Sequence, residues 1–415
     1  MNKNIYKRTI CASFLTGGSM AVASILSPLL FTTFNRQYDI SYTMLGFLIV
    51  LNFGVQLLLD LIYSFLSKRI DLKTSVKSTP FIMFSGLVIY ALSPMIFPGN
   101  IYAGLCIGTI IFSAGCGLAE VLISPVIAAI PSDNPQSLMS KLHSCYAWGV
   151  VLVVAFSSLF FYLFGYENWQ ILTLILSVFP FIAFLIMIKS EIPDIESKEK
   201  ATGSDGLLKN KTAILYILGI FFAGASEITM SQWCSGYLEV SFNINKTVGD
   251  LLGLALFGFT LGIGRTLYSK IGKNIDRVLF WGCFGTFVCY IVATFSSHPI
   301  PALMACALTG FTTSMLWPGS LIAVEKRIPN PGVGLYALMA TGGDLGATLF
   351  PQGVGYLIDR LMGSDAVMEF AKNTGIGIEQ LSMRGGMLFS SIAPILGTIL
   401  FYILMNSKKE NSKSV

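Results

Sequence analysis

The chain contains about twelve apolar runs that are each long enough to cross a bilayer, and this pattern restricts its fold more than any other feature. A bilayer core of ~30 Å needs about 20 apolar residues in a helix. Because lipid offers the backbone no hydrogen-bond partners, we expect every run to be helical. The runs cover residues 10–34, 44–66, 79–97, 101–130, 142–164, 170–188, 213–238, 251–271, 278–296, 300–324, 334–361 and 385–405.

The composition agrees with this pattern. Of the 415 residues, 54% are hydrophobic and only 12% are charged, which is too little charge to cover a soluble protein of this size. The sequence therefore predicts an all-α, polytopic membrane protein. The first run is too long for a secretory signal and lacks a small-residue cleavage site, so we expect it to remain as the first helix.

Lysine and arginine concentrate in alternate loops, which indicates the orientation of the chain. If both termini lie in the cytoplasm, the inner loops hold most of the cations, as the positive-inside rule requires. The outer segments then contain only Arg36, Lys246, Arg360, Lys372 and Arg384. We therefore expect a multi-pass protein of a bacterial inner membrane with both termini cytoplasmic.

A polar stretch at residues 191–210 divides the chain into two parts of similar length, and we expect a linker there between bundles at 1–190 and 211–415. The two parts also match at an offset of 205 residues. Tyr63, Ser64, Lys68, Ile70 and Asp71 fall on Tyr268, Ser269, Lys273, Ile275 and Asp276, and Asp60 falls on Arg265. Parallel repeats of this kind predict a transporter that rocks around a central site.

Isolated polar residues within the spans are the candidate functional groups. Glu120 is the only charged residue between Lys77 and Asp133, and a carboxylate at the bilayer centre costs about 2.5–3.5 kcal/mol. It is expected either to serve function or to make a structural hydrogen bond. Asn52, Gln56 and Asp60 lie on one helical stripe, which suits either ion coordination or an interhelical hydrogen-bond seam.

The spans contain four acids, Asp60, Glu120, Glu227 and Asp344, but the single base Arg265. Such an imbalance is costly unless protons or cations compensate it, so a proton or a sodium ion is expected as partner. Counting residues from the turn near 131–132 places Glu120 and His143 at similar depth. They form either a proton-linked pair or, if His143 lies at the helix end, no pair at all.

The same counting from the prolines at 329 and 331 places Trp317 opposite Asp344. An indole beside a carboxylate is a common arrangement for holding a sugar. Pro318 and Gly319 are expected to break the helix after Trp317 and to free backbone groups that face a cavity. Glu227, Gln232 and Trp233 lie close together in another span and are expected to line water.

Two segments resemble the major facilitator superfamily and, within it, its branch of fucose permease-like sugar–cation symporters. Glu120-Val-Leu-Ile-Ser-Pro125 resembles a helix 4 motif with a Glu four residues ahead of Asn-Pro, here with Ser124 for Asn. Residues 141–149 resemble the helix 5 opening of that branch, with His143 and Tyr146 on substrate-site positions. The resemblance implies twelve helices in two pseudo-symmetric six-helix bundles, and it implies proton coupling by Glu120.

The chain departs from that family pattern in two places. Ser24 stands where the branch has an aspartate in helix 1, so a relay of two carboxylates is not carried over. The loop signature after the second helix keeps only its basic part, Ser67-Lys68-Arg69. An acid in helix 2 together with one in helix 4 is similar to sodium-coupled sugar carriers of the same superfamily, so proton and sodium remain alternatives.

The leading hypothesis is a symporter that imports a sugar or similar polar solute by alternating access. Cation coupling is expected from Glu120, Asp60, Asn52 and Gln56; substrate binding from His143, Tyr146, Glu227, Gln232, Trp233, Trp317 and Asp344; and structural or gating roles from Arg265, Lys68 and Arg69. Beyond the coupling ion we expect no cofactor and no bound metal. The expected partners are a small-molecule substrate and the lipid bilayer, with no nucleic acid, and the protein is expected to be a monomer.

The alternative within transport is a proton-coupled efflux antiporter for amphipathic drugs or metabolites, which the aromatic content of 13% allows. A non-transporting receptor or a membrane enzyme is disfavoured, because the sequence has no nucleotide-binding loop, metal-ligand cluster or extramembrane domain.

Overall fold

The computed structural model describes residues 5–66, 71–132, 135–193, 210–271, 274–328 and 332–411, and within these ranges the chain is helical with no strand. Each of the twelve predicted runs forms a helix or an interrupted helix. Nine helices of the described chain are long and apolar enough to cross a membrane. The all-helical, polytopic architecture predicted from the apolar runs is therefore confirmed.

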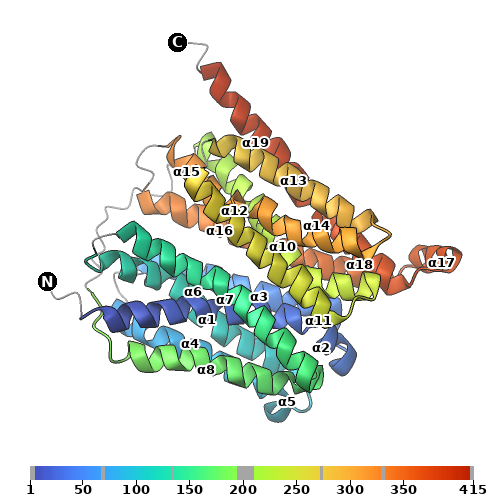
Figure 1. Cartoon of the computed structure of the whole chain (residues 1–415), viewed down its shortest axis with the longest axis horizontal. Helices are drawn as coiled ribbons and strands as arrows, with labels where there is room; N and C mark the ends of the chain where they lie inside the picture. The colour runs from blue at the N-terminus through green and yellow to red at the C-terminus, as the bar shows by residue number, and fades with distance from the viewer. Residues whose placement is uncertain are drawn as a thin grey trace. The chain divides into compact units, whose positions relative to one another are not determined.

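The chain forms two compact units (Figure 1). The first comprises Met1–Ile40 with Leu51–Glu199, and the second comprises Ser41–Val50 with Lys200–Val415. Most of the expected linker, residues 194–209, lies outside the described part of the chain, as do Lys68 and Arg69.

The first unit is built from six long helices with short pieces at their ends. They are α1 (Lys7–Leu29), α2 (Phe31–Tyr38), α3 (Tyr42–Leu66), α4 (Leu72–Ala91), α5 (Ser93–Ile96), α6 (Ile101–Ala129), α7 (Pro135–Phe164), η2 (Tyr166–Asn168) and α8 (Trp169–Met187).

The second unit contains more interrupted helices. They are α10 (Lys211–Phe242), α11 (Lys246–Val248), the π-helical segment η3 (Gly249–Ala255), α12 (Leu256–Ile271), α13 (Ile275–Phe295), α14 (Pro299–Thr313), α15 (Leu316–Glu325), α16 (Gly332–Met362), α17 (Asp365–Thr374), α18 (Ile378–Ser390) and α19 (Ile392–Asn411). Two predicted single runs, 300–324 and 385–405, are each split into two helices.

Corresponding helices pack in the same pairs in both units. In the first unit α1 packs against α7, and α4 packs against α6 and α8. In the second unit α10 packs against α16, and α13 packs against α14 and α19. This repeated pattern is the structural counterpart of the match at an offset of 205 residues.

Close packing of α4 on α6 depends on glycine. A Cβ atom on Gly86 would overlap the backbone of Phe112, and one on Gly108 would come within 2.7 Å of the Tyr90 backbone. Small residues let the helix backbones approach closely where apolar surface alone would not drive association. The pairing fixes α6, and therefore Glu120, within the first unit.

Residues 42–50 of α3 belong to the second unit, and α16 caps the first turn of this segment. Asp359 on α16 accepts hydrogen bonds from the backbone N–H groups of Tyr42 and Thr43, at 3.3 and 2.7 Å. The Tyr42 hydroxyl donates to Glu379 at 2.6 Å, and the carbonyl of Thr43 accepts from Gln352 at 3.3 Å. These contacts satisfy N–H groups that a helix start leaves without intrahelical partners.

The two repeat-related aspartates differ in their surroundings. Asp71 caps α4 from an exposed position, accepting from the Lys73 N–H at 3.1 Å and the Thr74 hydroxyl at 2.5 Å. Asp276, in the first turn of α13, instead pairs with Arg327 at 3.1 Å. Burial lowers the pKa of the Arg327 guanidinium, which lies over the ring of Tyr216 at 5.2 Å. One position of the repeat thus serves a local cap in one unit and a tertiary ion pair in the other.

Candidate functional site

The polar stripe on α3 forms a hydrogen-bond seam with α6. Gln56 donates to the Asn52 side-chain oxygen at 3.0 Å, and Ser113 on α6 donates to the same oxygen at 2.7 Å. Asn52 and Gln56 are both buried. Of the two readings that the sequence left open for these amides, the observed contacts favour the interhelical seam.

That seam also sets the level of the two carboxylates in the first unit. Asn52 lies against Ser113, and a Cβ atom on Gly117 would come within 3.0 Å of the Gln56 backbone. One turn further along both helices stand Asp60 and Glu120, close enough for their charges to interact. The Glu120 side chain is exposed and Asp60 is half-buried. Two carboxylates at one level repel each other unless a proton or cation compensates them.

The expected partners of Glu120 on α7 are only partly described. Tyr146 is half-buried within that helix. His143 lies on the described backbone of α7, but its side chain falls outside the described part of the chain. The predicted pairing of Glu120 with His143 therefore stays a prediction.

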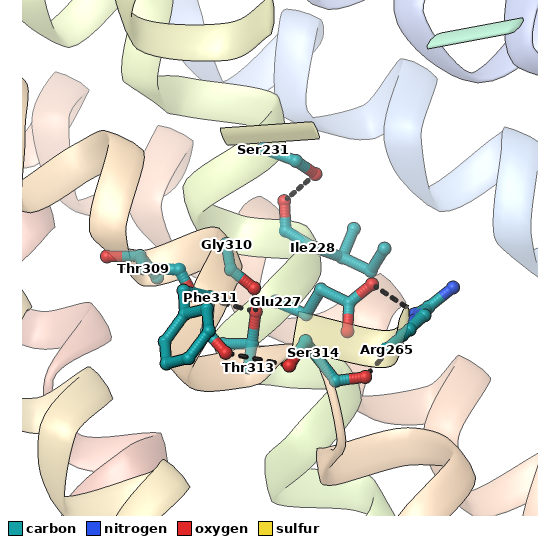
Figure 2. A network of polar contacts seen from close by, with 9 residues as sticks. All are labelled: Glu227, Ile228, Ser231, Arg265, Thr309, Gly310, Phe311, Thr313 and Ser314. Carbon is teal, nitrogen blue, oxygen red and sulfur yellow. Dashed lines mark hydrogen bonds and ion pairs between the residues drawn. The ribbon is translucent and has the colours of Figure 1, made fainter. Parts of the chain in front are cut away.

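In the second unit an acid and a base meet across two helices. Glu227 on α10 accepts a hydrogen bond from the Arg265 Nη2 of α12 at 3.3 Å, and the Arg265 Nε donates to the Ser314 carbonyl at 3.1 Å. Figure 2 shows both acceptors on one side of the guanidinium, with a terminal nitrogen pointing away from them. The other Glu227 oxygen, Oε2, is buried and has no hydrogen-bond partner among the described residues.

Proline chemistry explains why the Ser314 carbonyl is available. In an uninterrupted helix this carbonyl would accept from the N–H of residue 318, four positions later, but Pro318 has no N–H. The helix accordingly breaks between α14 and α15, at Ser314 and Met315, and the Gly319 N–H donates to Met315 at 2.8 Å. The break was expected after Trp317 and lies before it. The freed carbonyl receives a hydrogen bond from Arg265.

Trp317 lies at the junction of three helices. A Cβ atom on Gly343 of α16 would overlap its indole, and one on Gly224 of α10 would come within 3.1 Å of it. Asp344 follows Gly343 directly and is 5% exposed. The Trp317 indole thus packs against the residue that precedes Asp344, and the predicted pairing of Trp317 with Asp344 stays a prediction. Gly224 stands one turn before Glu227 on α10.

The other two residues of the α10 cluster are interior. Gln232 is 4% exposed and Trp233 is 1% exposed. The Trp233 indole N–H donates to the carbonyl of Pro351 on α16 at 3.1 Å, and its ring packs near Tyr42 with centroids 6.0 Å apart. Trp233 thus joins α10 to α16, and this placement favours a packing role over the lining of water.

A buried ion cluster at the end of α10 was not among the predicted site residues. Lys246 lies 3.5 Å from Asp250 and 3.8 Å from Glu239, and it donates to Ser235 at 3.2 Å. Asp250 is fully buried within η3. The sequence placed Lys246 in an outer segment, and its spacing of four residues from Asp250 was the available signal for a helical ion pair.

These features are those of a polytopic helical membrane transporter built from two repeated bundles. The chain belongs to the Major Facilitator Superfamily, whose family model matches residues 10–351. It is therefore a transporter and not an enzyme. An uncharacterised MFS-type transporter of Yersinia pestis is 20% identical over 278 residues, which cover 66% of this chain and 71% of that protein.

Solved structures share the fold at low identity. A bacterial homologue of the human lysosomal transporter Spinster, in an inward-facing and occupied conformation, has a TM-score of 0.74 at 12% identity and covers 97% of both chains. The D-xylose–proton symporter has a TM-score of 0.71 at 13% identity, covering 94% of this chain and 97% of its own. The fucose–proton symporter of E. coli has a TM-score of 0.59 at 14% identity, covering 96% and 99%.

Proposed function

We propose that this transporter imports a sugar or a similar polar solute together with a proton or a sodium ion, by alternating access. The observation that carries the proposal is the close approach of Gly117 on α6 to Gln56 on α3, one turn before Glu120 and Asp60 on the same two helices. Two carboxylates within electrostatic reach can share a proton or a small cation. An intramembrane carboxylate that serves transport must exchange its ion with water, and the Glu120 side chain is exposed.

The second unit supplies groups suited to a polyhydroxylated solute. Trp317 offers an aromatic face, while Glu227 and Asp344 offer acceptors for hydroxyl protons. Two of the solved structures with this fold are described as proton symporters for D-xylose and for fucose, which makes coupled sugar uptake a natural first test.

Uptake by purified protein in liposomes tests the proposal. Sugars would first be screened by thermal shift with and without sodium and at two pH values, because a ligand that binds only the folded state raises its stability. Uptake of each hit would then be measured with a proton gradient, a sodium gradient, both or neither. We expect accumulation above equilibrium with one ion gradient. Equal uptake under all four conditions would remove the coupling claim.

A further inference from the structure

We infer that the guanidinium of Arg265 binds an oxyanion group, a carboxylate or a phosphate, of the transported solute. The inference rests on the proposed function, since it narrows the class of polar solute, and it assigns Arg265 a binding role in place of a purely structural one. It depends on three features of the pair between Glu227 and Arg265.

The first feature is unused hydrogen-bonding capacity. Arginine has five N–H donors, and the described residues accept two of them, at Glu227 and Ser314, which leaves three. The two bonds come from Nε and Nη2, so the end of the guanidinium that carries Nη1 stays available. That end is a planar fork whose geometry matches the two oxygens of a carboxylate or phosphate.

The second feature is incomplete pairing. Glu227 meets Arg265 through a single bond of 3.3 Å, longer than the 2.7–2.9 Å that charge-assisted N–H···O bonds usually have. Its Oε2 is buried with no hydrogen-bond partner among the described residues. A pair built for stability would be bidentate and fully hydrogen-bonded, because desolvation otherwise outweighs the attraction.

The third feature is access. The Arg265 side chain is 36% exposed, against 12% for Glu227, so the cation is the more accessible member of the pair. Helical side chains lean toward the preceding turn. One turn before Arg265, a Cβ atom on Gly262 would meet no atom within 4 Å. Space therefore exists one turn before Arg265, on the side toward which helical side chains lean.

The charges of Glu227 and Arg265 explain how this site can exist both without solute and with an oxyanion bound. Without solute, Glu227 neutralises the guanidinium. An arriving oxyanion binds the free N–H groups at the end of the Arg265 guanidinium, while the hydrogen bond from the Arg265 Nε to the Ser314 carbonyl holds the guanidinium in place. Because Glu227 competes electrostatically with the oxyanion, its removal is expected to strengthen oxyanion binding, whereas loss of the fork weakens it. A merely structural pair predicts no such opposite signs.

The test compares matched ligands on the purified full-length protein. Glucose, galactose and mannose would each be titrated beside the corresponding uronic acid and 6-phosphate, and Kd would be measured from the thermal shift. In at least one series, we expect an anionic member to bind about tenfold more tightly than its neutral sugar. Whether the uronic acid or the phosphate binds more tightly identifies the oxyanion.

Two variants and a control test the role of Arg265 itself. R265K keeps the charge but loses the fork, and should weaken anion binding about tenfold with little effect on the neutral sugar. E227Q should tighten anion binding about fivefold. The control is R360K, the same change at an exposed arginine that contacts only Tyr356 of its own helix among the described residues.

The outcomes separate this inference from the proposed function. If neutral sugars bind and accumulate while no anionic member binds better, the inference fails and sugar import stands. If anionic members bind with the predicted variant effects but no ion gradient drives their uptake, coupled import fails and the inference stands. If R265K and E227Q change anion affinity in the same direction, or if no ligand of either kind binds, the inference is overturned.

Discussion

The two units of this transporter carry side chains of opposite charge at one repeat-related position within the membrane, and the surroundings of these side chains differ. Asp60 on α3 and Arg265 on α12 are related by the offset of 205 residues. Asp60 lies near a second acid, Glu120, whereas Arg265 lies 3.3 Å from its counter-charge Glu227. The first arrangement brings two like charges together, whereas the second pairs opposite charges. Under the two proposals above, the units divide the work: the first unit binds the coupling cation, and the second unit binds the charged group of the solute.

The largest expected effect is on coupling, and it belongs to the first unit alone. With one proton per solute, a gradient of one pH unit supports about a tenfold concentration ratio. E120Q and D60N should reduce that ratio to about one, because neither amide can carry the ion, while exchange of labelled for unlabelled solute continues. The measurement is gradient-driven uptake beside counterflow.

The control for these variants is E369Q, at an exposed acid of α17. It should accumulate solute like the wild type. Full accumulation by E120Q would show that other residues carry the coupling ion, and it would contradict the assignment of cation binding to the first unit.

The next effect is on stability, and its sign should differ between the units. Removing one member of a buried ion pair costs about 3–5 kcal/mol, and R265A should cost less than that because the side chain is partly exposed. D60N should be neutral or stabilising, since it relieves repulsion between like charges. Thermal unfolding in detergent measures both effects. A double variant, R265A with E227A, should recover part of the loss, because no isolated charge remains.

Equal destabilisation by D60N and R265A would contradict the comparison. It would mean that Asp60 depends on a favourable partner as strongly as Arg265 does.

The third effect concerns the packing that holds Trp317. G343A places a methyl group into the indole and should cost about 1–3 kcal/mol while weakening solute binding. G54A on α3, where the added Cβ would meet no atom within 4 Å, should be neutral or slightly stabilising because alanine favours helix. Binding and unfolding are measured on both variants. If the two variants had similar stability and similar solute affinity, the packing of Trp317 against Gly343 would have no role in either property.

Much of the architecture followed from local rules, because each span is specified by its own composition. Apolar length alone located the helices, and the 205-residue match anticipated the repeated packing of α1 on α7 and α10 on α16. The break near Trp317 was foreseen from Pro318 but placed too late along the chain. A missing N–H acts on the carbonyl four residues earlier, at Ser314.

The candidate site was less predictable, because partners from other helices decide it. Nothing local to Trp233 shows that its indole N–H binds the Pro351 carbonyl on α16. Likewise nothing local to Arg265, for which the sequence predicted a structural or gating role, shows its contacts with Glu227 and Ser314, because these residues come from helices far apart in the sequence. The counting that placed Trp317 opposite Asp344 uses only the turn that both residues flank, and the packing of the indole against Gly343 agrees with it.

The smallest effect separates the repeat-related aspartates Asp71 and Asp276. The hydrogen bond from the Thr74 hydroxyl, with backbone bonds from Thr74 and Lys73, lowers the pKa of the exposed Asp71 carboxyl. A carboxyl with a lowered folded-state pKa contributes stability above its unfolded pKa of about 3.9, and this contribution is lost as pH falls through the folded value. D71A should therefore lower the melting temperature slightly at neutral pH, with a difference from wild type that shrinks below about pH 4. T74V should reproduce part of the loss.

D276A should lower the melting temperature more than D71A does, because it leaves the half-buried Arg327 guanidinium without its ion-pair partner. An Asp71 effect equal to that of Asp276 would mean that a solvent-exposed cap holds the first unit as firmly as a tertiary ion pair holds the second.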